Sequence, residues 1–384
     1  MNDVYCSNKF NEVQIHVQSR LLYNCCKAWP ERINLDLLEK NPGSLFLTPT
    51  MKQDRELMLN GQRSKSCEHG CYRYEDQGLI SKRLKKEGDQ TIITNSSYPI
   101  TKLDLALSTD CNLTCAYCSS EWSSSWARDL IKNGEYNIKG YDNSINAWHK
   151  VWQKTKMSDR SWNSRFNKLL IEEIKMAKSL KHIEILGGEP LLNDYIFDLI
   201  ESNPEKSFGI STGLGVSEIR FLNFVEKIKD KKNIRLSLSS ESTKQFFEFL
   251  RFGIKWKNFL AKIELLEKKS INFHFNSVIT NLATFDVFNF YNLFGKKYKI
   301  RYGNVTGKSF LLPNVLDDES KKICLEQIGA RNEDFFVYLK KEIMQPYNDN
   351  ERIKLSIFLK KFSSRRGLKL DIFPQHFLQW LDIV

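Results

Sequence analysis

The sequence has no long hydrophobic run and no recognisable targeting segment. Its apolar stretches span only a few residues, far fewer than the roughly 20 that a membrane-crossing helix needs. The N-terminus, MNDVYCSNKFNEV, lacks the basic region followed by an apolar one that marks a secretory signal peptide. We therefore expect a cytoplasmic protein with no membrane partner.

Extreme composition is also absent. Hydrophobic residues make up 41 % and charged residues 27 % of the 384 residues, which excludes the disordered and fibrous classes. The net charge of +12 comes from 58 Lys and Arg against 46 Asp and Glu. A general lysine bias is one explanation and an anionic partner is the other, so a nucleic acid partner is not excluded.

Nine cysteines are many for a chain of this kind. Their odd number and the length of the chain argue against a disulfide scaffold. Cys6 and Cys324 are isolated in the sequence, so we expect each to be a buried or incidental thiol. The other seven stand in clusters, which in a reducing compartment indicates metal or iron–sulfur ligation.

Strand-like and helix-like segments alternate from about residue 100. Leu103, Leu105 and Leu107 alternate with other residues, as in a half-buried strand. Five further strands are predicted at 182–186, 207–211, 233–239, 271–278 and 298–302. Helical patterns lie between them, at about 166–180, 193–203, 216–230, 243–268 and 284–295. This order predicts an α/β fold, a partial (β/α)6 barrel of the TIM type, with parallel strands joined by helical crossovers.

The flanking segments predict a three-part organisation. Residues 1–99 form a small cysteine-bearing α+β region that includes a hairpin. Residues 100–304 form the barrel core, with a tryptophan-rich insertion at 119–162 that is either a satellite hydrophobic cluster or a lid. Residues 305–384 form a helical C-terminal extension.

The strongest motif follows the first barrel strand. Cys111, Cys115 and Cys118 have the spacing C-x3-C-x2-C, so their thiols converge where the chain loops around a compact group. Thiolates suit iron–sulfur clusters and zinc. Three cysteines leave one iron of a 4Fe–4S cluster open to a small molecule, whereas zinc would need a fourth ligand.

This spacing after the first strand resembles the signature of the radical SAM superfamily. A second match is Gly187-Gly188-Glu189-Pro190, which follows the strand predicted at 182–186. The resemblance implies that this segment receives the amino group of S-adenosylmethionine. Glycines permit close approach of the backbone, and Glu189 can accept a charge-assisted hydrogen bond from an ammonium group.

Weaker matches extend the resemblance over about residues 100–300. It implies contacts to S-adenosylmethionine from Tyr117, near the adenine, and from Ser211 and Thr212 at the third strand end. Arg251 matches an arginine that binds the cofactor carboxylate. Ser237 lies in a strand that often ends in Ser-x-Asp-Gly, but here Ser239 and Ser240 replace the last two residues.

Two cysteine groups precede the core, Cys25-Cys26 and Cys67-x3-Cys71. The second continues through Glu75, Gly78, Ser81 and Arg83, and resembles the radical SAM branch with a twitch domain, although its cysteine spacing is one residue longer. The resemblance implies an auxiliary iron–sulfur cluster. A structural zinc, with His69 as a further ligand, and plain reduced thiols are the alternatives.

The resemblance implies a specific chemistry. A reduced 4Fe–4S cluster cleaves S-adenosylmethionine, and the 5′-deoxyadenosyl radical abstracts hydrogen from a peptide or small metabolite. An electron donor of the flavodoxin or ferredoxin type is then a partner. The alternatives are a radical SAM enzyme that modifies tRNA or nucleosides, and a non-enzymatic iron–sulfur or zinc protein. The sequence identifies neither the substrate, nor the radical-quenching residue, nor the fate of S-adenosylmethionine, nor the oligomeric state.

Overall fold

The computed structural model describes residues 4–84, 93–139 and 160–383. The chain divides into two compact units, each assembled from several stretches. The first unit comprises 1–109, 155–211 and 231–234, and the second comprises 110–154, 212–230 and 235–384. The predicted domain boundaries at 99 and 304 stay predictions. None of the helices in the described part combines the length and hydrophobicity that crossing a bilayer requires.

The first unit contains a mostly parallel sheet. Its strands are β1 (Glu12–His16), β2 (Leu21–Tyr23), β3 (Glu31–Arg32), β4 (Lys102–Ala106), β5 (His182–Leu186) and β6 (Ser207–Thr212). They follow the order β3-β2-β1-β4-β5-β6. The antiparallel hairpin β1–β2 joins the parallel strands because β1 pairs in parallel with β4, with Val13 opposite Leu103. The N-terminal region therefore extends the sheet that β4 begins.

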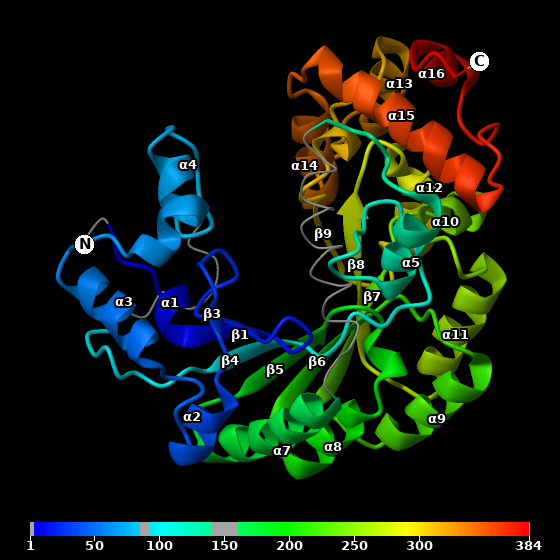
Figure 1. The fold of residues 1–384 in the computed structure, drawn as a ribbon. Helices are drawn as coiled ribbons and strands as arrows, with labels where there is room; N and C mark the ends of the chain where they lie inside the picture. The colour runs from blue at the N-terminus through cyan, green and yellow to red at the C-terminus, as the bar shows by residue number, and fades with distance from the viewer. Residues whose placement is uncertain (1–3, 85–92, 140–159, 384) are drawn as a thin grey trace. The chain divides into compact units, whose positions relative to one another are not determined.

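Helices cover one face of this sheet. Figure 1 shows α2, α7 and α8 side by side along it. The face below them is apolar because Leu103, Leu105, Ile183 and Ile185 are fully buried and alternate with polar residues, the period of a strand. The helices and helical turns of the unit are α1 (Asn8–Asn11), α2 (Leu35–Lys40), α3 (Pro49–Leu59), η1 (Lys65–Cys67), η2 (Glu68–Tyr72), α4 (Arg73–Glu75), α7 (Arg160–Met176), η3 (Pro190–Leu192) and α8 (Tyr195–Ser202).

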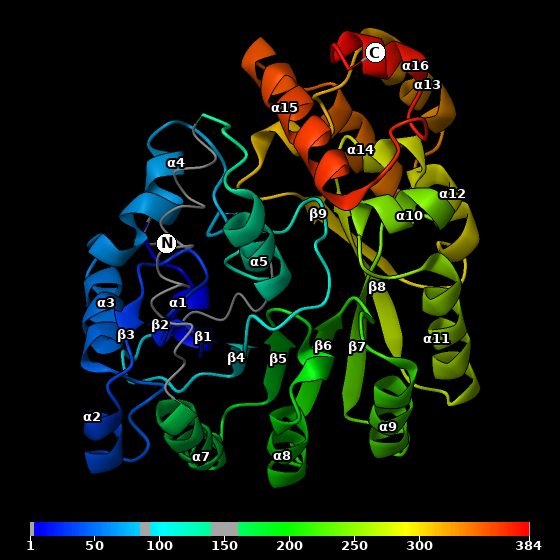
Figure 2. The same cartoon turned by 45° about the vertical axis from the view of Figure 1, so that its right-hand side comes forward.

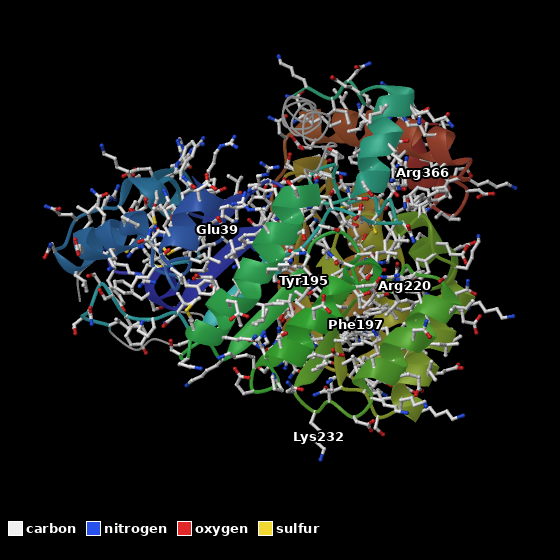
Figure 3. All side chains as sticks on the ribbon, turned by 60° about the horizontal axis from the view of Figure 1, so that its bottom comes forward. Glu39, Tyr195, Phe197, Arg220, Lys232 and Arg366 are labelled. Carbon is white, nitrogen blue, oxygen red and sulfur yellow. The ribbon has the colours of Figure 1, made fainter. Side chains whose placement is uncertain are left out.

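Helix α7 shows why the predicted periodicity was informative. Phe166, Leu170 and Ile174 recur every four residues and are fully buried, so one stripe of the helix faces the core. The hydroxyl of Tyr195 on α8 (labelled in Figure 3) donates to the carbonyl of Asn167, which joins the two helices.

The second unit continues the strand-and-helix order. Its strands β7 (Ile234–Ser239), β8 (Phe273–Ile279) and β9 (Ile300–Asn304) are parallel neighbours. Its helices and turns are α5 (Ser124–Asn133), α9 (Glu218–Ile228), α10 (Lys244–Leu250), α11 (Trp256–Lys268), η4 (Ala283–Phe285), α12 (Val287–Phe294), η5 (Ser309–Leu311), α13 (Asp318–Ile328), α14 (Asp334–Ile343), α15 (Asp349–Arg366) and α16 (Gln375–Trp380).

These elements confirm the α/β class and an open, partial barrel rather than a closed one. Among the described strands, β3 in the first unit and β9 in the second each have a neighbour on one side only. The part predicted as a C-terminal extension is helical, and α13 to α16 gather in one region of the second unit (Figure 2). Trp148 and Trp152 of the predicted insertion lie outside the described residues.

One predicted helix was wrong in extent. The pattern over 243–268 suggested a single helix, but α10 ends at Leu250 and α11 begins at Trp256. Gly253 lies between them with φ at +118°, and a Cβ there would stand 2.8 Å from the carbonyl oxygen of Asn112. The break is needed because another backbone segment passes too close for a side chain.

The aromatic core of the second unit yields a stability prediction. Phe358 on α15 is fully buried beside Tyr136 and Phe362. Replacing Phe358 with Ala should lower the free energy of unfolding by about 3–5 kcal/mol, because the cavity cannot collapse fully. Ile353→Ala on the same helix, where the side chain is 50 % exposed, should change it by less than about 0.5 kcal/mol. Urea denaturation followed by tryptophan fluorescence measures both, and equal losses would contradict the assigned core.

Candidate functional site

Cys111, Cys115 and Cys118 lie on one loop of the second unit, residues 111–118, which we call the cysteine loop. Five carbonyls of this loop accept hydrogen bonds from side chains outside it. Ser125 donates to Cys111 O at 2.6 Å, and Ser123 donates to Leu113 O at 2.8 Å. The indole of Trp126 donates to Cys115 O at 2.9 Å. The carbonyls therefore have fixed partners, which restricts the conformations of the cysteine loop.

Two amides of the same loop pair with the break between α10 and α11. Thr114 N donates to Phe252 O at 2.9 Å, and Ala116 N donates to Leu250 O at 2.7 Å. The loop and the 250–252 segment thus lie against one another as two extended chains do. This pairing explains why Gly253 has no room for a side chain beside Asn112.

Lys308 holds the remaining two of the five carbonyls. Its ammonium donates to Ala116 O at 2.7 Å and to Cys118 O at 2.6 Å. It also lies 4.5 Å from the centre of the Trp126 ring, a cation–π distance. Burial lowers the pKa of Lys308 to about 7, while negative charge at Cys118 opposes this shift.

The three core thiols differ in burial. Cys111 and Cys115 are buried and Cys118 is half-buried. Burial, and then negative charge at Cys115 and Cys111, raise the pKa of the Cys118 thiol. Ligands of one tetrahedral zinc lie about 4 Å apart, and within the described residues the group with three such atoms inside 4.8 Å is Glu12, Cys25 and Cys26.

Tyr117 and Arg251 lie together in a buried polar group. Arg251, at the end of α10, contacts the hydroxyl of Tyr117 and lies 3.5 Å from the carboxylate of Glu241. The Tyr117 hydroxyl is 3.2 Å from the same carboxylate. Glu241 is fully buried, and its Oε1 and the Nε of Arg251 have no hydrogen-bond partner. Burial raises the pKa of Glu241 well above the usual carboxyl range.

The Gly187–Pro190 segment belongs to the first unit. Gly187 has φ at +86°, and a Cβ there would stand 3.0 Å from Ser108 O and from Ala106 Cβ. Glycine is therefore required for the chain to pass the end of β4, whose last residue, Ala106, is five positions ahead of Cys111 in the sequence. Glu189 is 2 % exposed and accepts from Leu191 N at 3.2 Å, while Pro190 opens η3. Gly188 also has a positive φ, +48°.

The three hydroxyl residues predicted to contact the cofactor lie at or near strand ends. Ser211 donates to Glu184 Oε1 at 3.0 Å within the first unit. Thr212 Oγ1 accepts from Leu214 N at 2.9 Å. Ser237 is buried in β7 of the second unit. Their predicted role towards S-adenosylmethionine stays a prediction.

The N-terminal cysteines lie on two loops that touch. Trp29 N, just after Cys25-Cys26, donates to Ser66 O at 2.8 Å, just before Cys67. A side chain at Gly70 would collide with the carbonyl of Lys27. The glycine inside the C-x3-C spacing therefore lets the loop bearing Cys71 approach the loop bearing Cys25.

Within these loops the cysteines form two groups. Cys25 and Cys26 lie beside Glu12, and Lys82 Nζ is 3.2 Å from Cys26 Sγ. The hydrogen bond from Cys25 lowers the pKa of Cys26 to about 6 and raises that of Cys25. Cys67 joins a small buried core with Cys6, and burial raises the pKa of the Cys67 thiol. Cys6 is thus closer to this region than its isolated place in the sequence suggests.

The sequence run after Cys71 has a structural explanation. Ser81 Oγ donates to Glu75 Oε1 at 2.5 Å, and the Arg83 guanidinium pairs with both oxygens of Glu75. Gly78, at φ +74°, makes the turn between them. Glu75, Gly78, Ser81 and Arg83 therefore close one loop around a half-buried ion pair.

Comparisons with known proteins agree with the motif in the core. Residues 105–286 match the family model of the Radical SAM superfamily. Over these residues, just under half of the chain, the protein is similar to the radical SAM superfamily. The predicted cofactors, a 4Fe–4S cluster and S-adenosylmethionine, are those of this family. The donor set of three thiols on one loop, two of them buried and one half-buried, fits such a cluster.

A curated relative and several solved structures are also similar. The radical SAM cyclopropyl synthase TigE of Paramaledivibacter caminithermalis is 24 % identical over 231 residues, 58 % of this chain and 44 % of the relative. The chain thus spans less than half the length of that relative. The structure of anSMEcpe with bound AdoMet is 17 % identical, over 55 % of this chain and 51 % of that one, with a TM-score of 0.37. Streptococcus suis SuiB bound to precursor peptide SuiA is 14 % identical over 95 % and 71 %, with a TM-score of 0.36.

Sequence reasoning missed three residues of this radical SAM domain and its surroundings. Glu241 stands two positions beyond Ser239, where the motif lacks its acid, and the serine-rich run 239–242 was the available signal. Trp126 lies in the insertion that was predicted to be either a satellite hydrophobic cluster or a lid; it is fully buried in a hydrophobic cluster, and its bond to Cys115 O was not foreseen. Lys308 follows β9 by four residues and carries no local signal, because its partners are 190 residues earlier in the chain.

The buried carboxyl of Glu241 predicts a pH effect. Because its folded-state pKa is raised, the folded state holds the proton more tightly, and stability should fall as pH rises above about 4.3 through that pKa. Glu241→Gln should remove this loss, so that the variant gains stability relative to the parent as pH increases. Urea midpoints measured from about pH 5 to 8 test this. The matched control is Glu264→Gln, on an exposed position of α11; an equal change there would refute the assignment.

Proposed function

We propose that this chain is a radical SAM enzyme acting in the cytoplasm on a peptide or small metabolite. Cys111, Cys115 and Cys118 would hold the 4Fe–4S cluster. The observation that supports this most is the set of three thiols, two buried and one half-buried, on one loop whose carbonyls accept hydrogen bonds from side chains outside it. When bound, the cluster and S-adenosylmethionine supply one-electron chemistry that ends in hydrogen-atom abstraction from a substrate carbon.

The chain's own residues supply binding and orientation. Gly187 and Gly188 bring backbone close to the cofactor, and Glu189 would accept from its amino group. Arg251 and Glu241 offer one unpaired donor and one unpaired acceptor in a buried polar group. Unpaired buried polar atoms are costly, which supports a ligand that completes them. The electron would come from a partner of the flavodoxin or ferredoxin type.

The activity is tested directly on the reconstituted protein. Anaerobic loading with iron and sulfide, followed by reduction with S-adenosylmethionine, should yield 5′-deoxyadenosine on chromatography. Cys115→Ala should reduce this product at least ~100-fold, because a missing thiolate opens the cluster site. Cys324→Ala removes a buried thiol of α13 and should leave the product within about twofold. A colourless, zinc-loaded protein without product would favour a non-enzymatic metal protein instead.

We also propose an auxiliary metal site on the two touching loops of the first unit, with Cys25, Cys26, Cys67 and Cys71 as ligands. This corresponds to the twitch resemblance. The contact of Trp29 with Ser66 and the close passage of Gly70 support it, since both bring the loops together. An alternative is a single zinc held by Glu12, Cys25 and Cys26, whose ligand atoms lie within 4.8 Å.

Metal content distinguishes these ligand sets. Cys71→Ala should lower iron and sulfide by about half, from two four-iron clusters to one, while Cys6→Ala should leave both unchanged. Gly70→Ala should lower the metal content too, because its side chain would force the loops apart. Elemental analysis of the reconstituted variants measures this. Retained iron in Cys71→Ala, or stoichiometric zinc lost only in Glu12→Gln, would contradict the iron–sulfur site.

A further inference from the structure

Lys308 is a fully internal charge in a chain whose other cations are mostly at the surface. It is 2 % exposed and follows β9 in the second unit. Moving an ammonium from water into a protein interior costs several kcal/mol unless strong partners replace the water. Such a residue therefore needs a specific environment to offset this cost.

Lys308 contacts the cysteine loop, the Trp126 ring that supports this loop, and the Phe358 ring of α15, whose centre is 5.0 Å from the ammonium. The Lys308 ammonium donates to the carbonyl oxygens of Ala116 and Cys118, the residues on either side of Tyr117. The Trp126 ring beneath the ammonium is the same side chain that donates to Cys115 O. Lysine and tryptophan together thus fix three carbonyls within the C-x2-C half of the motif.

Charge gives this arrangement a consequence for the cluster. Three thiolate ligands bring negative charge to this loop, and an added electron brings more. Reduction potentials of iron–sulfur clusters depend on net charge and on local dipoles. A positive charge in a low-dielectric interior acts strongly at short range and favours the reduced form.

We propose that Lys308 is a positioning residue that also raises the reduction potential of the cluster on Cys111, Cys115 and Cys118. This inference rests on the proposed function. The lysine acts through the carbonyls of Ala116 and Cys118, and through its charge, rather than by touching substrate. It makes the cluster easier to reduce, the step on which electron transfer from a protein partner depends.

Lys262 provides a matched control within the same unit. It is also buried, at 7 % exposed, and donates to two carbonyls, Leu214 O at 2.7 Å and Val216 O at 2.6 Å. It bonds no carbonyl of the cysteine loop among these contacts. Removing it therefore tests the loss of a buried lysine that caps backbone, separately from the effect on the cysteine loop.

The experiment is a potentiometric titration of the reconstituted full chain without S-adenosylmethionine, followed by EPR. The signal lost in Cys115→Ala identifies the cluster of interest. Lys308→Gln keeps donors but removes the charge, and should lower the midpoint potential by at least ~59 mV, a tenfold change in the one-electron equilibrium. Lys308→Arg keeps the charge. Its midpoint potential should therefore differ from that of the parent by less than about a third of the shift expected for Lys308→Gln. Lys262→Gln should leave the potential unchanged.

The outcomes separate the two proposals. An unchanged potential in Lys308→Gln at full iron content would overturn the role of Lys308 while leaving the proposed function intact. An equal shift in Lys262→Gln would overturn it too, since any buried lysine would then suffice. If Lys308→Gln takes up no cluster, the Lys308→Arg variant decides: normal uptake and potential support the charge, and failed uptake contradicts it. A parent protein that binds no cluster would overturn the proposed function itself.

Discussion

The candidate site depends on how the backbone of the cysteine loop is held. A loop that presents three thiols towards a common centre must bond its own peptide groups elsewhere, because unpaired buried peptide groups are costly. Here the carbonyls accept from Ser123, Ser125, Trp126 and Lys308, and two amides pair with the break after α10.

This requirement explains features of the second unit that lie far from the cysteines in sequence. The helical pattern stops at Leu250 because the carbonyls of Leu250 and Phe252 serve the loop instead of the helix. Helix α5 begins beneath the loop, with Ser123 acting both as its N-cap and as a donor to Leu113 O. Arg366 at the end of α15 (Figure 3) reaches Thr114 Oγ1 at 2.9 Å, so the C-terminal helices also support the site.

The first unit is organised around a different buried charge. Lys9 is fully buried and donates to Asp54 and Asn24 at 2.6 Å, while Arg55 donates to the carbonyls of Lys9 and Phe10. This network ties α1 to α3 beneath the two cysteine-bearing loops. A satisfied buried network holds its elements in one arrangement, which gives Cys67 and Cys71 a fixed scaffold. In both units, therefore, lysines inside the protein fix backbone that carries cysteines.

Local sequence patterns predicted much of the secondary structure and the cysteine motif of this protein. Alternation of apolar residues located the strands, four-residue spacing located α7, and the cysteine spacing with Gly187-Gly188-Glu189 indicated the superfamily. Each signal is short-range, because strand and helix periods and a ligand loop are complete within a few residues. The division at Gly253 and the reach of Lys308 to Ala116 and Cys118 left no such signal, and for the buried carboxyl of Glu241 the serine-rich run 239–242 was a weak one. They arise because residues more than a hundred positions apart share one buried space, where each peptide group and charge must find a partner, and only the tertiary structure determines which partner that is.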